Sequence, residues 1–195
     1  MAATDTEPAL AEGHRRNPLT STPTGGRILS AAQVPWFMLR PPRGFGVLTT
    51  IGRKSGKKRR RCVRVARVDN TAYLTSIRGS KAGWLRNVRA HPTVWLRLRG
   101  GTFEGTARAL RADEFDVARN VYCEMLNPLD RIEYLLHMPG RPTRARIKAL
   151  HEHWFTTGAP LAIELAVMTP GREAGWLGTP VGRHRDRPAG GLRLR

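Results

Sequence analysis

The chain has 195 residues, 40% of them hydrophobic, which is enough for one domain with a real hydrophobic core. Its net charge of +19 predicts an anionic partner: nucleic acid, an acidic membrane surface or a polyanionic small molecule. The two cysteines, Cys62 and Cys123, lack CxxC spacing, and no apolar run approaches a membrane span or a signal-peptide core. These features exclude a disulfide framework and favour a cytoplasmic protein with reduced thiols.

The N-terminal part is expected to hold a tail and one helix. Residues 1–26 are rich in Ala, Thr, Pro and Gly, which predicts a disordered tail. Residues 27–39 look amphipathic, although Pro35 should kink or end a helix there. The apolar residues near one face of this helix are Ile28, Leu29, Ala32, Trp36 and Leu39. We expect Trp36 to pack in the core. The alternatives are that it caps a substrate mouth or seats the helix on a membrane.

The middle of the chain reads as strands. Short β runs are expected at residues 45–51, 60–68, 71–76, 93–99 and 102–110. The turn signals Asp69-Asn70 and Gly100-Gly101 should join the last four of these runs into two hairpins. A short helix at residues 81–90 is expected between the hairpins, stopping before Pro92.

The C-terminal part reads as helices followed by one strand. Helices are expected from Asp113 onward and at residues 128–137 and 143–155, and alternation favours a strand at 161–168. Residues 169–195, rich in Gly, Pro and Arg, should form a flexible basic tail. The fold class is therefore mainly β with α, a small β-barrel with peripheral helices, in a domain spanning residues 27–168.

The most informative stretch is residues 48–61, LTTIGRKSGKKRRR. Gly52 and Gly56 allow the backbone conformations of a tight turn. Two cations and a hydroxyl lie between these glycines, and five more cations follow. Such a turn, with exposed backbone N–H groups, suits an anion and above all a phosphate. Its spacing does not match a Walker A loop.

Residues 49–60, TTIGRKSGKKRR, together with residues 73–110, resemble the deazaflavin-dependent nitroreductase family. The second segment carries the block W-x-x-N-x-x-A-x-P at residues 84–92. Members of this family are split β-barrel (FMN-binding-like) oxidoreductases of actinobacteria that use coenzyme F420. The resemblance implies that this chain is an F420-dependent reductase. It covers about a third of the chain strongly and leaves the tails outside.

The resemblance also implies a cofactor site. In such proteins the turn holds the cofactor's phosphate and acidic tail, while a second segment lines the deazaflavin ring. We expect Asn87 to bond backbone and to fix its helix against the turn. By position, the turn residues are Arg53, Lys54, Ser55, Gly56, Lys57 and Arg59, and the ring-side residues are Ser76, Gly79, Ser80, Lys81, Trp84 and Asn87.

The expected reaction is hydride transfer from reduced F420 to an electron-poor acceptor such as a quinone, a nitroaromatic or an enone-like compound. No protein nucleophile is required, because the cofactor carries the hydride. Candidates for a catalytic role are Tyr122, Tyr134 and Ser76. We expect no metal site, because His151 and His153 are two residues apart and would point in different directions on a helix.

Other interpretations remain open. The chain could bind F420, FMN or haem without turnover, or it could be a basic nucleic-acid-binding module. Against nucleic acid, no helix-turn-helix, finger or RNP-like strand is recognisable. A peripheral contact with the inner face of an anionic plasma membrane, and a homodimer, are both compatible with the enzyme hypothesis.

Overall fold

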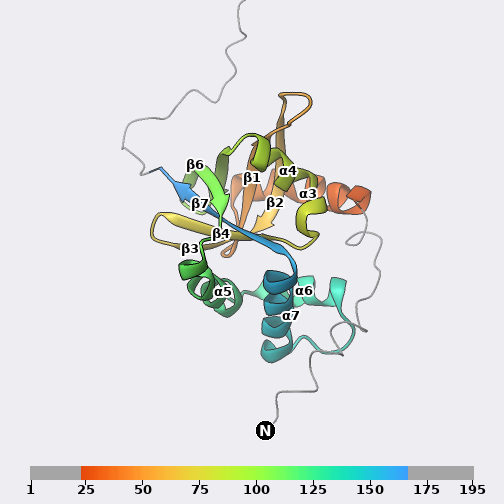
Figure 1. Ribbon diagram of the computed structural model, residues 1–195. Helices are drawn as coiled ribbons and strands as arrows, with labels where there is room; N and C mark the ends of the chain where they lie inside the picture. The colour runs from red at the N-terminus through yellow and green to blue at the C-terminus, as the bar shows by residue number, and fades with distance from the viewer. Residues whose placement is uncertain (1–22, 167–195) are drawn as a thin grey trace, which may run out of the picture.

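The computed structural model describes residues 23–166. Within this part, seven strands form one antiparallel sheet, and five α-helices lie around it (Figure 1). The strands are β1 Phe45–Ile51, β2 Lys58–Arg64, β3 Ala66–Val68, β4 Thr71–Ser76, β5 Thr93–Leu98, β6 Gly101–Ala109 and β7 Ala159–Leu165. The helices are α3 Pro23–Leu39, α4 Gly83–Ala90, α5 Phe115–Glu124, α6 Pro128–His137 and α7 Arg144–Thr157.

The sheet curls into a barrel. Its strand order is β2-β1-β5-β6-β7-β4-β3, so β2 and β3 are the two edges. Only Val65 separates these two strands in sequence, and its backbone N–H donates to the Gly44 carbonyl at 2.9 Å. Because one residue joins the two edges, the sheet must close on itself there. We call this junction the seam. The expected barrel with peripheral helices, a split-barrel fold, is confirmed.

Most predicted elements are confirmed, with shifts of a few residues at their ends. The runs at 45–51, 71–76 and 93–99 correspond to β1, β4 and β5. Both hairpins form, and Asp69 adopts a positive φ of 50° in the first. Helix α6 occupies the predicted range, because Asn127 caps it by accepting from Leu129 N at 2.9 Å and Pro128 starts it.

The prediction of one strand at residues 60–68 is wrong. The chain pairs with β1 up to Arg64, breaks at Val65 and then pairs with β4 from Ala66 onward. Alternating valines indicate a strand but do not reveal that its two halves belong to opposite edges. The break follows from the closure of the barrel, which is a long-range property.

The expectation for the first helix is also wrong in two respects. Helix α3 begins at Pro23 rather than at residue 27, and it ends at Leu39 as expected, with Pro35 inside it. Its buried residues include Ser30 and Phe37, whereas Trp36 is 70% exposed and Leu39 77% exposed. The Ser30 hydroxyl accepts from the backbone of Cys62 at 2.8 Å, which seats this polar side of the helix on β2. Trp36 is therefore not a core residue.

Two layers of packing result. The barrel interior is filled by alternating strand residues such as Leu48, Leu74 and Leu96, together with Leu85 and Val88 of α4. Helices α5, α6 and α7 lie together below the barrel in Figure 1, on its outer side. Cys123 is buried among them, in the core role that the sequence favours.

Arg64 connects the two layers at the seam. Its guanidinium donates to the Asp130 carboxylate and to the Met125 carbonyl, and it lies 5.3 Å from the Tyr122 ring. Both partners of the Arg64–Asp130 ion pair are almost fully buried. Removing one partner of such a buried pair strongly destabilises a protein, because the other charge stays buried without its counter-charge. The docking of the helical layer on the barrel therefore depends on the Arg64–Asp130 pair.

None of the helices in residues 23–166 has the length and apolar character to cross a bilayer. The expected tails lie outside the described residues, apart from residues 23–26, which belong to α3 rather than to a disordered segment.

Candidate functional site

The GRKSGK segment forms the tight turn between β1 and β2, as predicted. Gly52 donates to the Lys57 carbonyl at 2.9 Å, and Gly56 donates to the Gly52 carbonyl at 2.7 Å. Gly56 has a positive φ of 63°, which favours glycine. Gly52 is needed for a different reason, because a Cβ there would lie 2.9 Å from Ser55 Oγ and 3.1 Å from the Lys57 carbonyl.

The turn does not present a row of free backbone N–H groups, which corrects one expectation. Ser55 N donates to the Gly52 carbonyl at 3.1 Å, and Arg53 N donates to Asn87 Oδ1 at 3.3 Å. Lys57 N lies 3.4 Å from Ser55 Oγ, a long hydrogen bond. Any anion bound here must therefore be held chiefly by side chains.

Asn87 fixes the turn against α4, as the sequence predicts. Its Oδ1 accepts from Arg53 N, and its Nδ2 donates to Thr50 Oγ1 at 3.4 Å. One side chain thus links α4, the end of β1 and the start of the turn. Leu85 and Val88 anchor the same helix in the barrel core, so the position of the turn is tied to a rigid element.

The side chains of the turn are exposed cations. Arg53, Lys54 and Lys57 point into solvent, and none of the salt bridges within residues 23–166 includes them. In β2, Arg59 pairs with Thr50, so both side chains lie on the sheet face to which Asn87 bonds. The positive charge of Arg53, Lys54, Lys57 and Arg59 therefore gathers at the turn with no salt-bridged carboxylate among the described residues.

Two further arginines extend this charge and were not among the predicted site residues. Arg61 pairs with Leu48 of β1, on the same sheet face as Arg59. Burial lowers the pKa of Arg61, and the positive charge of Arg78 lowers it further. The two guanidiniums are therefore close enough to repel each other. Arg61 belongs to the basic run of residues 57–61, which the sequence shows. Its proximity to Arg78, however, depends on the fold.

The second predicted segment, residues 76–81, forms the loop before α4. Ser76 is buried, and its hydroxyl donates to the Gly79 carbonyl at 3.0 Å, so it shapes the loop. Gly79 has a positive φ of 53° and begins a short 3-10 turn, Gly79–Lys81. Ser80 and Lys81 are exposed, and Trp84 packs half-buried against the barrel core.

The two tyrosine candidates lie elsewhere. Tyr122 is buried between Arg64 and the Phe155 ring, and burial raises its pKa well above the usual range. Tyr134 is also buried, and its hydroxyl donates to the Pro139 carbonyl at 3.2 Å. Both belong to the helical layer, which lies at the opposite end of the molecule from the β1–β2 turn (Figure 1). The fold does not bring them to the cationic turn.

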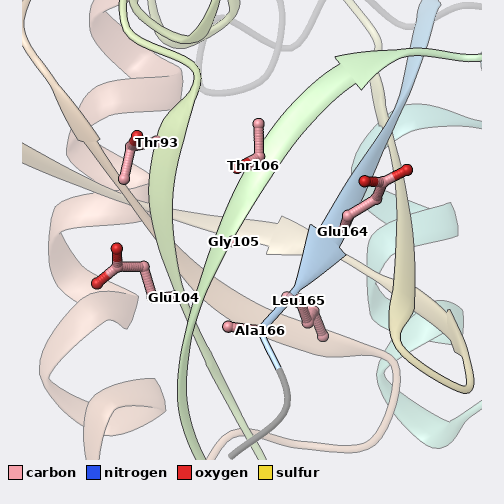
Figure 2. A pocket seen from close by; sticks show the side chains of 7 residues that line it. All are labelled: Thr93, Glu104, Gly105, Thr106, Glu164, Leu165 and Ala166. Atoms are coloured by element: carbon pink, nitrogen blue, oxygen red, sulfur yellow. The ribbon is translucent and has the colours of Figure 1, made fainter.

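A separate hollow lies on the sheet across β5, β6 and β7. Figure 2 shows its lining, which includes Thr93, Thr106, Glu104 and Glu164. The Glu104 carboxylate accepts from Trp95 Nε1 at 3.1 Å, and Glu164 accepts from Arg108 Nε at 2.7 Å. None of the predicted site residues lines this hollow, and its acidic character does not suit an anionic cofactor.

Comparison with known proteins agrees with the resemblance read from the sequence. The model of the "F420H(2)-dependent quinone reductase" family matches residues 39–128, a little under half of the chain. This range includes the turn, the 76–81 loop and Asn87. A search of curated proteins gave no match.

Several solved structures superpose on part of the chain, all with TM-scores below 0.5. An F420-H2 dependent reductase superposes with a TM-score of 0.45 at 21% identity, covering 64% of this chain and 95% of that one. A domain-swapped dimer gives 0.43 at 20% identity, covering 63% and 81%. A heme binding protein from Mycobacterium smegmatis gives 0.42 at 14% identity, covering 70% and 51%. Likeness at this level does not extend to the site or to the substrate.

The family match carries the assignment. It supports an oxidoreductase with coenzyme F420 as its cofactor. The predicted resemblance is thus confirmed: the segment that holds the cationic turn and α4, residues 39–128, matches the model of the F420H(2)-dependent quinone reductase family.

Proposed function

We propose that this protein transfers a hydride from reduced F420 to an electron-poor acceptor, with a quinone as the first choice. Nitroaromatic and enone-like compounds are the other acceptor classes. The observation that carries the proposal is the group of exposed cations at the β1–β2 turn, Arg53, Lys54, Lys57 and Arg59, which form no salt bridge within residues 23–166. The family match over the same segment supports it.

The residues of the turn fit this cofactor. F420 bears a phosphodiester and an oligoglutamate chain, so it is a flexible polyanion. Arginine offers phosphate a planar fork and lysine offers a mobile point charge. Arg53, Lys54, Lys57 and Arg59 would hold the anionic part, with Ser55 as a hydroxyl donor and Gly56 keeping the turn tight. Because the turn is exposed, a long acidic tail can follow it outward.

The loop and helix next to the turn would hold the ring. The backbone of residues 76–81 offers N–H and C=O groups, and Trp84 offers an apolar edge. Asn87 is a positioning residue, because it acts through Arg53 and Thr50. The deazaflavin supplies the hydride when bound, so the chain need only orient it and exclude water.

Proton delivery falls to solvent in this proposal. Ser76 donates its proton to the Gly79 carbonyl, and Tyr122 and Tyr134 are buried in the helical layer. A reduction whose proton comes from water needs no titrating side chain at the turn. Replacing Tyr134 by Phe should therefore leave kcat unchanged, and a large loss would restore that tyrosine as a candidate.

The first test is binding. Purified full-length protein is titrated into F420, followed by its fluorescence, with FMN and a short DNA duplex as competitors at two salt concentrations. Micromolar binding that survives moderate salt and resists FMN supports the proposal. Binding of DNA with a steep salt dependence and no affinity for F420 would instead favour the nucleic-acid-binding module.

The second test locates the site. Replacing Arg53 and Lys54 together by Ala should weaken F420 binding by about 2 kcal/mol or more, because charge-assisted bonds are lost. The matched control replaces Arg131 and Arg141, two exposed arginines of the helical region, and removes the same charge. Equal losses in both variants would show that only the overall charge matters.

Turnover separates an enzyme from a binding protein. A panel of quinones, nitroaromatics and enones is offered to the protein with reduced F420, and loss of the reduced cofactor is followed. Binding without reduction of any acceptor would support a protein that only binds or stores F420 or FMN.

We further propose a peripheral contact with an anionic membrane through α3. Its exposed apolar stripe consists of Ile28, Trp36 and Leu39, and Arg40 and Arg43 follow it. Apolar side chains beside cations suit the surface of an anionic bilayer, from which a lipid quinone could enter. Co-sedimentation with anionic but not neutral liposomes, lost in Trp36→Ala, is expected. Self-association that Trp36→Ala abolishes, without liposome binding, would instead assign the stripe to a homodimer.

A further inference from the structure

A buried polar cluster lies where the helical layer meets the seam, away from the cationic turn. We define it by its members: Arg64, Tyr122, Asp130, Glu133, His151 and Trp154. Asp130 and Glu133 lie three residues apart on α6, so they share one face of that helix. His151 belongs to α7 and is 1% exposed.

This cluster contains unsatisfied polar atoms. Within residues 23–166, the buried side-chain atoms without a hydrogen-bond partner are Arg64 Nε, Glu133 Oε2, His151 Nδ1 and Trp154 Nε1. All four belong to the cluster. Buried polar groups in native proteins almost always have partners, so such a concentration indicates a bound ion or ordered water at this place.

The charges in the cluster are incompletely balanced. Arg64 donates to Asp130, and Asn127 donates to both oxygens of the same carboxylate. Asp130 is therefore already neutralised. Glu133 Oε2 lies 3.9 Å from Arg64 Nη1, too far for a hydrogen bond, so the second carboxylate lacks a bonded cation. A further positive charge next to Glu133 would complete the balance.

The geometry suits a metal ion. One ligand atom from each of Asp130, Glu133 and His151 can be chosen so that all three lie within 4.8 Å of one another. Two ligand atoms of a tetrahedral Zn2+ ion, each at a bond length of about 2.0–2.2 Å, are separated by about 3.4 Å. Small side-chain shifts would therefore close the site.

We propose that Asp130, Glu133 and His151 bind one divalent transition-metal ion, which joins α6 to α7 beside the seam. A donor set of two carboxylates and one imidazole matches Zn2+ or Mn2+ better than Mg2+ or Ca2+, which prefer oxygen ligands alone. The imidazole of His151 is available because its buried Nδ1 has no hydrogen-bond partner within residues 23–166. Open coordination positions would hold water, whose second lone pair can accept from the Trp154 or Arg64 N–H.

The role of this ion is structural. It lies in the helical layer, whereas the proposed cofactor site is at the β1–β2 turn, so metal removal should not abolish F420 binding. Asp130 would bind both Arg64 and the metal ion. Its ion pair with Arg64 connects α6 to the barrel, and its bond to the metal would connect α6 to α7. This inference does not depend on the proposed function.

The test uses the full-length protein after treatment with EDTA. Zn2+ is added and binding is measured by calorimetry, with thermal unfolding as a second readout. One saturable equivalent per chain and a rise in Tm are expected. Glu133→Gln should weaken Zn2+ binding by roughly tenfold or more, because it removes an anionic ligand but keeps its shape.

Two further variants make the result decisive. His151→Gln should lose Zn2+ binding as Glu133→Gln does, whereas His91→Gln, at an exposed loop histidine, should retain it. If His151→Gln does not fold, Glu133→Gln alone decides. Absence of saturable binding, or equal binding by wild type and Glu133→Gln, would overturn the proposal and leave a proton or a water molecule as the missing partner.

Discussion

The seam and the β1–β2 turn use arginine in opposite ways. Arg64, at one end of β2, is buried, bonded to Asp130 and stacked near an aromatic ring. Arg59, near the other end of the same strand, is exposed and forms no salt bridge within residues 23–166. Composition alone cannot distinguish the two. Removing a cation that is bonded to a buried carboxylate destabilises the fold, whereas exposed cations without carboxylate partners are available to a ligand.

The largest expected effect is at the seam. Arg64→Met should lower the free energy of unfolding by about 3–5 kcal/mol, because Asp130 would stay buried without its cation. Urea unfolding measures the change. The same substitution at the turn, Arg53→Met, should change stability by no more than about 0.5 kcal/mol. Similar losses in both variants would remove the distinction between the two regions.

An intermediate case is Arg108, which is partly exposed and donates to Glu114 and Glu164. Glu114→Gln should cost about 1–3 kcal/mol, the range for a charge-assisted hydrogen bond. This loss should lie between those of Arg64→Met and Arg53→Met. A loss as large as that of Arg64→Met would mean that partial exposure does not weaken the pair.

The same pair predicts a pH dependence. The hydrogen bond from Arg108 lowers the pKa of Glu114 to about 2, below its ordinary 4.5. Its contribution to stability is therefore complete above pH 4.5 and is lost as the pH falls toward 2. Unfolding measured across this window should show a smaller slope in Glu114→Gln. Identical slopes in the two proteins would contradict the assignment.

A smaller effect is expected where α4 meets the turn. Asn87→Ala removes two long hydrogen bonds, so F420 affinity should fall by about 1 kcal/mol while the charge of the turn is unchanged. Fluorescence titration gives the affinity. Asn120→Ala, at an exposed position on α5, is the control and should bind as wild type does. Unchanged affinity in Asn87→Ala would mean that the turn holds its shape alone.

A small effect on stability, within the same bound as that of Arg53→Met, is expected at Arg61. Arg61→Met removes a cation that Arg78 repels, so stability should change by no more than about 0.5 kcal/mol. F420 affinity should nevertheless fall, and its dependence on salt should become weaker. A clear loss of stability with unchanged affinity would make Arg61 a structural residue like Arg64.

Local patterns predicted much of this molecule. Short β runs indicated β1 and β4, alternation indicated β5, the turn signals indicated both hairpins, and residues 128–137 were expected to form the helix that is α6. The motif at residues 52–57 and the W-x-x-N block indicated the tight turn and the contact of Asn87 with it. These features depend on residues that are close together in sequence, so local sequence patterns are enough to predict them.

Only the tertiary structure decided the rest. The break at Val65, the outward position of Trp36 and the pairing of Arg64 with Asp130 all join segments distant in sequence. The pattern of a strand does not determine which neighbouring strand each half of it will pair with. The apolar face of a helix does not determine which part of the molecule will pack against it. The physical reason is that closure of the barrel and docking of the helical layer minimise the free energy of the whole chain. This minimum depends on contacts between distant segments, so the sequence of one segment does not determine it.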